Sequence, residues 1–142
     1  MKHIAILAFF IFSSLFSSFD GKAQTSQSKS TSAKIEIIDF YGTHRCTTCK
    51  AIEANTKYTL DTYFKEEQKN GILVFKTVNV DEDKNYKIAE AYEASGTALF
   101  LNIIKKAKET HVDLTDFAFS KGRDKEVFSR ELKSKIEAAL KE

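Results

Sequence analysis

The chain has 142 residues, enough for one domain of ordinary size with a buried core. Lys and Arg together number 22 and Asp and Glu 20, so the formal net charge is only +2. This balance excludes a strongly basic or acidic protein, and we expect neither nucleic acid nor an anionic membrane surface as a partner. The 30% of charged residues are expected to form a solvated surface of mixed sign.

The N-terminus has the layout of a secretory signal peptide. A short basic start, Lys2–His3, precedes a mostly apolar run over residues 4–16. Gly21-Lys22-Ala23 then places small residues three and one positions ahead of a possible cleavage site before Gln24. The run is shorter than the roughly 20 apolar residues that span a bilayer, and an uncleaved membrane anchor is the alternative.

The chain is therefore expected to divide into three parts. Residues 1–23 form the signal peptide, and residues 24–33 (QTSQSKSTSA) form a polar, flexible leader. Residues 34–142 form the mature domain, which we expect to be periplasmic or secreted.

The mature domain begins with an alternation of strand and helix patterns. Residues 34–41 read KIEIIDFY, which is typical of a strand buried on both faces of a sheet. From about Cys46 the pattern becomes helical for about 20 residues, until Asn70-Gly71 ends it. The expected buried stripe of this helix is Ile52, Thr56, Thr59, Leu60, Tyr63 and Phe64.

A second strand and helix follow. Residues 72–80 read ILVFKTVNV and predict the strand. Asp81-Glu82-Asp83 offers an N-cap for a helix over about residues 84–94. We expect Ile88, Ala91 and Tyr92 to face inward, and Gly96 to follow the end of this helix.

The C-terminal part predicts two strands and a helix. Residues 97–104 (TALFLNII) form a third apolar strand, and residues 110–119 alternate as a half-exposed antiparallel strand. The charged turn KKAKE between them lacks the glycine usual in hairpins. A final helix is expected from about Asp124, with an apolar stripe of Val127, Phe128, Leu132, Ile136 and Leu140.

The predicted order is β-α-β-α-β-β-α. Its opening implies parallel pairing with right-handed crossovers. We therefore predict an α/β fold with a mixed four-stranded sheet and helices on both faces.

The chemistry is expected at Cys46-Thr47-Thr48-Cys49, where a strand and loop lead into a helix. At a helix N-terminus, unpaired N–H groups and the helix dipole stabilise a thiolate. His44, Arg45 and Lys50 add positive charge nearby. Cys46 would then attack a substrate disulfide, and Cys49 would resolve the mixed disulfide.

Two other uses of the cysteine pair stay open. Both thiolates could hold a soft metal or arsenite, with His44 as a third ligand, although a closed zinc site needs four ligands. A purely structural disulfide is weakly motivated because so short a loop contributes only roughly 2 kcal/mol. No haem is expected, because Lys50 stands where a c-type haem site has His.

Two segments resemble the thioredoxin superfamily. Residues 37–53 (IIDFYGTHRCTTCKAIE) look like its active-site segment, and residues 75–102 (FKTVNVDEDKNYKIAEAYEASGTALFLN) look like its second stretch. The segment HRCTTCKAIE also resembles small exported thioredoxin-like proteins of Bacteroidetes type. Those are often labelled as a nitrophenyl-compound nitroreductase subunit family associated with arsenic-resistance loci.

The resemblance implies a thioredoxin-like fold and roles for particular residues. Asp39 takes the place of the family's buried Asp, which helps to move the proton of the second cysteine; a strand-end Asp turned to solvent is the alternative. Tyr41 stands where thioredoxins carry an exposed aromatic residue, with core packing as its alternative. Arg45, Thr97 and Ala98 complete the expected substrate-binding set.

The sequence departs from the family pattern at three points. One extra residue separates Asp39 from Cys46, the spacer is Thr-Thr rather than Gly-Pro, and the chain has no proline. Thr97 or Ala98 therefore replaces the family's cis-proline. A cis bond before another residue costs about 2.5–4 kcal/mol, so we expect a trans bond there.

These observations favour an exported thiol–disulfide oxidoreductase that uses Cys46 and Cys49 and needs no cofactor. Its partners would be protein thiols or disulfides, or a dedicated redox protein, and we expect a monomer. A metal- or metalloid-binding module and a redox-inactive thioredoxin-fold subunit are the alternatives.

Overall fold

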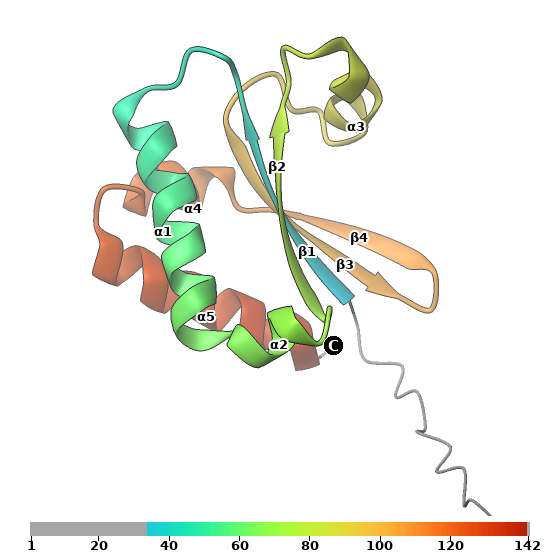
Figure 1. Cartoon of the computed structure of the whole chain (residues 1–142), viewed down its shortest axis with the longest axis vertical. Coiled ribbons are helices and arrows are strands. Elements are labelled where there is room, and N and C mark those ends of the chain that lie inside the picture. The colour runs from blue at the N-terminus through green and yellow to red at the C-terminus, as the bar shows by residue number, and fades with distance from the viewer. Residues whose placement is uncertain (1–33, 142) are drawn as a thin grey trace, which may run out of the picture.

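The structure is a computed structural model that describes residues 34–141 (Figure 1). The predicted signal peptide and leader lie outside the described residues. The strands are β1 (Lys34–Tyr41), β2 (Leu73–Asn79), β3 (Ala98–Lys105) and β4 (Lys108–Asp113). The helices are α1 (Thr47–Tyr63), α2 (Lys65–Lys69), the 3-10 turn η1 (Asp83–Asn85), α3 (Tyr86–Ala91), α4 (Thr115–Lys121) and α5 (Lys125–Lys141).

The four strands form one mixed sheet in the order β2-β1-β3-β4. β1 pairs in parallel with β2 and antiparallel with β3, and β3 pairs antiparallel with β4. This confirms the predicted α/β class, with the mixed four-stranded sheet expected of a thioredoxin-like fold. β1 is one of the two interior strands, and it is buried over nearly its whole length because its side chains enter the cores on both faces of the sheet.

Helices cover the two faces of the sheet unequally. On one face, α1, α4 and α5 lie over the larger core, which includes Ile37, Leu101 and Phe128 (Figure 1). On the other face, the short α3 region covers only one end, where Phe40 and Tyr92 pack together. The rest of that second face carries polar side chains, among them Glu36, which pairs with Lys34 on its own strand and with Lys76 on β2.

The first predicted helix is interrupted at Phe64. The side chain of Phe64 is only 3% exposed, and its backbone (φ −132°, ψ 31°) leaves the helical region between α1 and α2. The turn is consistent with burying this ring against the core instead of continuing along the solvent-facing side. The predicted end at Asn70-Gly71 is confirmed, with Gly71 at φ 69°. Tyr63 was wrongly expected to be buried, since it is 46% exposed.

The second predicted helix is shorter than expected. It consists of η1 and α3, which ends at Ala91, and Glu93 then takes a left-handed φ of 52°. Ala91 is exposed, contrary to expectation, whereas Tyr92 is buried. Among the described residues, no side chain caps η1 or α3; Asp81, an expected cap, accepts the backbone N–H of Thr43 at 2.6 Å instead.

The predicted strand over residues 110–119 is wrong in its second half. β4 ends at Asp113, whose carboxylate accepts the N–H of Thr115 at 2.8 Å as α4 begins. Leu114 and Ala118, four residues apart, both enter the core, which is the spacing of a helix face. The strand therefore ends where the chain turns back over the α1 side of the sheet.

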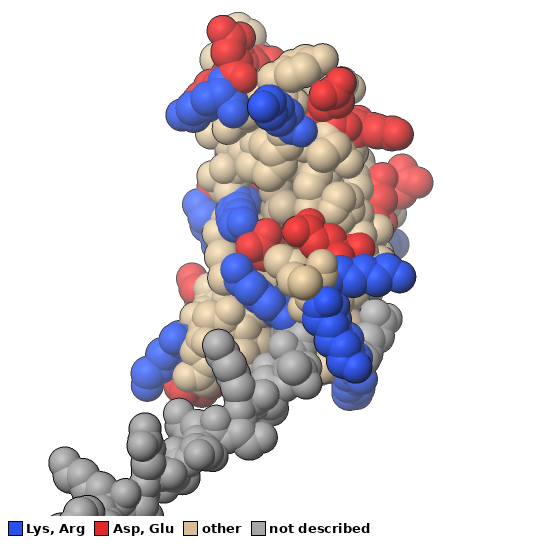
Figure 2. All heavy atoms as spheres, turned by 90° about the vertical axis from the view of Figure 1, so that its right-hand side faces the viewer, with Lys and Arg blue, Asp and Glu red and all other residues tan. Residues whose placement is uncertain are grey.

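The surface has mixed charge, as expected. Figure 2 shows Lys and Arg side chains interspersed with Asp and Glu on the face that carries the uncovered part of the sheet. None of the helices that the structure describes is long and apolar enough to cross a membrane.

Candidate active site

Cys46 and Cys49 form a disulfide at the start of α1, just beyond the carboxyl end of β1. Cys46 is the N-cap of α1, with an extended backbone (φ −71°, ψ 166°), and its Sγ accepts the N–H of Cys49 at 3.1 Å. A sulfur atom therefore occupies the capping position that oxygen takes in most helices. Cys46 is exposed, whereas Cys49 is only 7% exposed.

The surroundings of Cys46 favour negative charge on its sulfur. The first turn of α1 contains no acidic residue, and free backbone N–H groups at a helix start attract an anion. A surface hollow of about 610 Å³ lies beside Cys46 and is lined also by Thr43, His44, Arg45 and Lys50. The exposed sulfur therefore faces a side of the molecule with cationic residues.

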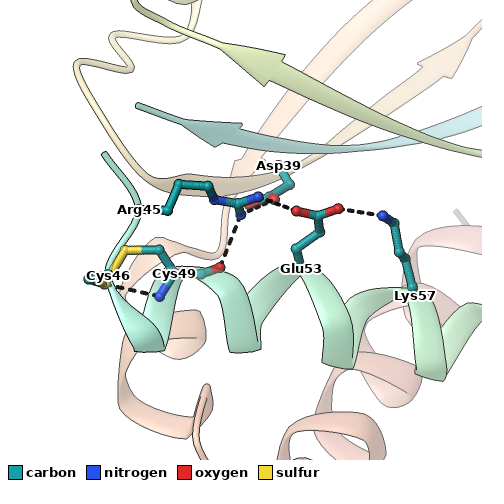
Figure 3. A network of polar contacts seen from close by, with 6 residues as sticks. All are labelled: Asp39, Arg45, Cys46, Cys49, Glu53 and Lys57. Atoms are coloured by element: carbon teal, nitrogen blue, oxygen red, sulfur yellow. Dashed lines mark hydrogen bonds and ion pairs between the residues drawn. A yellow bond between two sulfur atoms is a disulfide. The ribbon is translucent and has the colours of Figure 1, made fainter. Parts of the chain in front are cut away.

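A chain of polar contacts runs behind the disulfide, between β1 and α1 (Figure 3). Arg45 Nη2 donates to Asp39 Oδ2 at 3.2 Å and to the carbonyl oxygen of Cys49 at 3.1 Å. Arg45 Nη1 pairs with Glu53, and the other carboxylate oxygen of Glu53 pairs with Lys57. One guanidinium thus connects Asp39, Cys49 and Glu53.

Asp39 lies at the inner end of this chain. Its side chain is 0% exposed, and its Oδ1 has no hydrogen-bond partner among the described residues. Burial raises the pKa of Asp39 to about 7, because desolvation and the nearby Glu53 charge outweigh the opposing effect of Arg45. The carboxyl group can therefore gain or lose a proton near neutral pH. The alternative of an Asp turned to solvent does not apply.

Glu53 has the opposite electrostatic environment. Its contacts with Lys57 and Arg45 hold the pKa of its carboxyl below the usual range. Glu53 therefore stays negative over the range in which Asp39 titrates. The site thus holds one fixed anion and one titrating carboxyl, both in contact with the guanidinium of Arg45 (Figure 3).

Tyr41 lies against Arg45. The guanidinium carbon of Arg45 is 4.5 Å from the centre of the Tyr41 ring, a distance typical of a cation–π contact. The ring is partly exposed. Two of the four expected substrate-binding residues, Tyr41 and Arg45, therefore join the network behind the disulfide, where Arg45 points toward Asp39 rather than into solvent.

Thr97 and Ala98 occupy a separate place. They line a second hollow of about 410 Å³ together with Tyr92, Asp113 and Thr115. Ala98 begins β3 and pairs with Phe40 of β1. The described residues contain no cis peptide bond, so the link between Thr97 and Ala98 is trans, as expected. Thr97 and Ala98 are not among the described residues that line the hollow beside Cys46.

The corner between α4 and α5 supports the first turns of α1. Arg123 Nε donates to Thr48 Oγ1 at 2.8 Å, and Asn55 Nδ2 donates to the carbonyl oxygen of Gly122 at 2.9 Å. These contacts join segments that are far apart in the sequence. They hold the cysteine-bearing end of α1 against the C-terminal part of the chain.

No family model and no curated protein sequence matches the chain. Among solved structures, it is similar to one described as a malarial protein, at TM-score 0.39 and 16% identity over 62% of this chain and 94% of that chain. It is also similar to a thioredoxin of Fasciola hepatica, at TM-score 0.40 and 19% identity over 62% of this chain and 76% of that one. A third is a structure of the first two thioredoxin domains of Eps1p from Naumovozyma dairenensis, at TM-score 0.38 and 19% identity, covering 64% of this chain and 34% of that one.

Two of these three structures are thus described as thioredoxins or thioredoxin domains. At such identities and TM-scores, the similarities carry no conclusion about activity, substrate or partner. Those questions depend on the geometry around Cys46 and Cys49.

Sequence reasoning missed Glu53 and Lys57. They follow Cys49 at successive four-residue steps, so all three lie along one side of α1. The spacing was a usable signal, but charged residues at such positions are usually solvated. Here that side of α1 faces Asp39 and Arg45 instead.

For the metal-binding alternative, the described residues offer two cysteines but no complete cluster of metal ligands. Within residues 34–141, no group of three or more His, Cys, Asp and Glu side chains is arranged to hold a metal ion. His44 lines the hollow beside Cys46, so it is the nearest candidate for a third ligand.

Proposed function

We propose that the protein is an exported thiol–disulfide oxidoreductase that works through Cys46 and Cys49. The observation that carries the proposal is the asymmetry of the pair. Cys46 is exposed at a helix start, whereas Cys49 is buried on the side of Asp39 and Arg45. A structural disulfide needs neither an exposed sulfur nor a titrating carboxyl behind it. We also propose that the chain is related to the small exported proteins of Bacteroidetes type that the segment HRCTTCKAIE resembles.

The reaction starts from the reduced pair. The thiolate of Cys46 attacks one sulfur of a substrate disulfide, forming a mixed disulfide and releasing the first substrate thiolate. Cys49 then loses its proton to the Asp39 carboxylate and attacks the Cys46 sulfur. This forms the Cys46–Cys49 disulfide and releases the second substrate thiolate, which takes up the proton held by Asp39. Two electrons have passed to the substrate, and the dithiol of a partner protein must be oxidised to reduce the Cys46–Cys49 pair for the next cycle.

The first test is a redox titration. Equilibration in glutathione buffers, followed by trapping of free thiols, should show one two-electron transition between dithiol and disulfide. Cys49→Ser should accumulate a mixed disulfide on Cys46, whereas Cys46→Ser should accumulate much less because Cys49 is buried. Equal trapping by the two variants would contradict the assigned roles, and a pair that never exchanges would end the oxidoreductase proposal.

The same reduced protein separates this proposal from metal or metalloid binding. Reduced protein and the two serine variants can be titrated with Cu(I) and with As(III). An affinity no better than that of a free dithiol supports the redox function. Tight binding that both substitutions abolish, without thiol exchange, would favour the binding module.

A further inference from the structure

We propose that Arg45 and Glu53 are positioning residues that set the pH at which Asp39 accepts a proton from Cys49. This inference rests on the proposed function, because it assigns the control of its second step. Neither residue is proposed to touch substrate. Both act through Asp39.

The first argument is the shared guanidinium. Arg45 is held at once by Asp39, by the carbonyl oxygen of Cys49, by Glu53 and by the Tyr41 ring. Its side chain is only 15% exposed, so these contacts are shielded from water. Ion pairs that are partly buried are screened much less than surface pairs. Arg45 therefore has a fixed position between the carboxyl of Asp39 and the backbone of Cys49.

The second argument is the unused oxygen of Asp39. Arg45 bonds only Oδ2, whereas Oδ1 has no hydrogen-bond partner among the described residues. A carboxylate with one oxygen held and one free is oriented and can still accept a proton. Arg45 thus fixes Asp39 without blocking it.

The third argument is that the two neighbours have opposite effects on Asp39. The positive charge of Arg45 favours the carboxylate form of Asp39, and the negative charge of Glu53 disfavours it. Arg45 contacts Asp39 through Nη2 and Glu53 through Nη1, so both carboxyl groups act on one cation. Removing the cation and removing the anion should therefore move the titration of Asp39 in opposite directions.

Few other charges face Asp39. Lys57 on α1 lies beyond Glu53 and adds a smaller positive influence. Across the sheet, the neighbours of Asp39 are Thr77 on β2 and Leu99 on β3, which are both uncharged. The charged groups that control this carboxyl thus come from the loop before α1 and from α1 itself.

The test measures Asp39 directly in the oxidised protein, where neither cysteine titrates. Carboxyl ¹³C NMR of the whole mature chain gives the Asp39 midpoint in the unsubstituted protein, Arg45→Met, Glu53→Gln and Lys50→Met. Arg45→Met should raise the midpoint by about one pH unit. Glu53→Gln should lower it. Lys50→Met removes an exposed cation beside Cys46 and should leave the midpoint unchanged.

Shifts of Arg45→Met and Glu53→Gln in the same direction, or no shift in either, would overturn the proposal. If Arg45→Met does not fold, Glu53→Gln alone decides: a raised or unchanged midpoint overturns it. Arg45→Lys keeps the charge but not the planar fork, and its midpoint should fall between those of the unsubstituted protein and Arg45→Met.

A kinetic measurement connects this control to the reaction. Mixing reduced protein with an aromatic disulfide that releases a coloured thiolate should give a concentration-dependent phase for attack by Cys46. A concentration-independent phase for resolution by Cys49 should follow. The pH midpoint of the second phase should shift as the Asp39 midpoint shifts. In Glu53→Gln the midpoint of the first phase should stay fixed, because Glu53 does not line the hollow beside Cys46.

The two failures are distinguishable. If neither kinetic phase appears, the proposed function fails, although Asp39 can still titrate as expected in the oxidised protein. If both phases appear but neither substitution shifts the pH midpoint of the second phase, the proposed oxidoreductase function is retained and the role of Arg45 and Glu53 is rejected.

Discussion

Asp39 is an ionisable residue whose environment should affect stability as well as chemistry. An ordinary Asp side chain has a pKa of 3.8, whereas burial raises the pKa of Asp39 in the folded protein to about 7. Between these two values the folded protein holds a proton that the unfolded chain has lost. Stability is therefore greatest below the lower value and declines as pH rises through the upper one.

Asp39→Asn should remove this loss. The difference between the two pKa values corresponds to roughly 4 kcal/mol, so the oxidised variant should gain up to that much at about pH 8 relative to the unsubstituted protein. At about pH 3 the gain should almost disappear, because the unfolded chain then also holds most of the proton. Urea unfolding of both proteins at the two pH values measures it. An equal difference at both values would show that Asp39 does not titrate as described.

At the scale of single residues, the sequence identified most of the site but did not predict how its side chains contact one another. Cys46, Cys49 and Asp39 followed from spacing and from resemblance. Arg45 was expected to add positive charge near the cysteines, but it points inward to Asp39 and Glu53. The direction of a long side chain depends on which partners the fold brings near it. No pattern in the chain specifies that for Arg45.

The elements show a similar division between local and tertiary information. Apolar, β-branched runs predicted β1, β2 and β3, because a buried strand leaves a local hydrophobic signature, and an alternating pattern predicted β4. The interruption at Phe64 and the end of β4 at Asp113 were missed. Both are places where the chain turns to bury a side chain against a distant surface, and local pattern does not report that surface.

The turn between β3 and β4 gives a prediction at the scale of an element. Lys105 pairs with Lys108, and the two residues between them, Lys106 and Ala107, have positive φ values of 51° and 62°. Two-residue hairpin turns with this backbone prefer Asn-Gly, since side chains with a Cβ are disfavoured there. The turn keeps the geometry without the preferred residues.

The double substitution Lys106→Asn with Ala107→Gly should therefore raise the free energy of unfolding by about 1 kcal/mol. Chemical denaturation measures the gain. Placing the same Asn-Gly pair at Glu137 and Ala138, which are adjacent inside α5, should instead destabilise the protein. A hairpin variant no more stable than the unsubstituted protein would contradict the left-handed turn.

At the scale of the whole molecule, the candidate active site depends on a contact between distant parts of the chain. Arg123 and Thr48 are 75 positions apart, yet their side chains share a hydrogen bond. The corner between α4 and α5 thereby supports the end of α1 that carries both cysteines. The predicted strand over residues 110–119 did not include helix α4, and without α4 this corner does not form. The missed helix α4 is therefore what brings the C-terminal part of the chain to the site.

Gly122 makes this contact possible. A Cβ built on Gly122 would lie 2.6 Å from the carbonyl oxygen of Ala118 and 2.9 Å from a side-chain carbon of Ile52 on α1. The clash with the Ala118 carbonyl would distort the corner itself, because that oxygen belongs to the backbone of α4. The clash with Ile52, which is fully buried and has little room to move, would push the corner away from α1. We expect a loss of about 1–3 kcal/mol in the free energy of unfolding, the usual cost of overpacking.

Gly96→Ala is the matched control for this substitution. Nothing lies within 4 Å of a Cβ built on Gly96, so this alanine should be neutral or slightly stabilising. Urea denaturation of the two oxidised variants makes the comparison. Because the corner holds the first turns of α1, Gly122→Ala should also speed hydrogen exchange at the amides of residues 50–53, whereas Gly96→Ala should not. Equal stability of the two variants would mean that the corner and α1 are not in close contact.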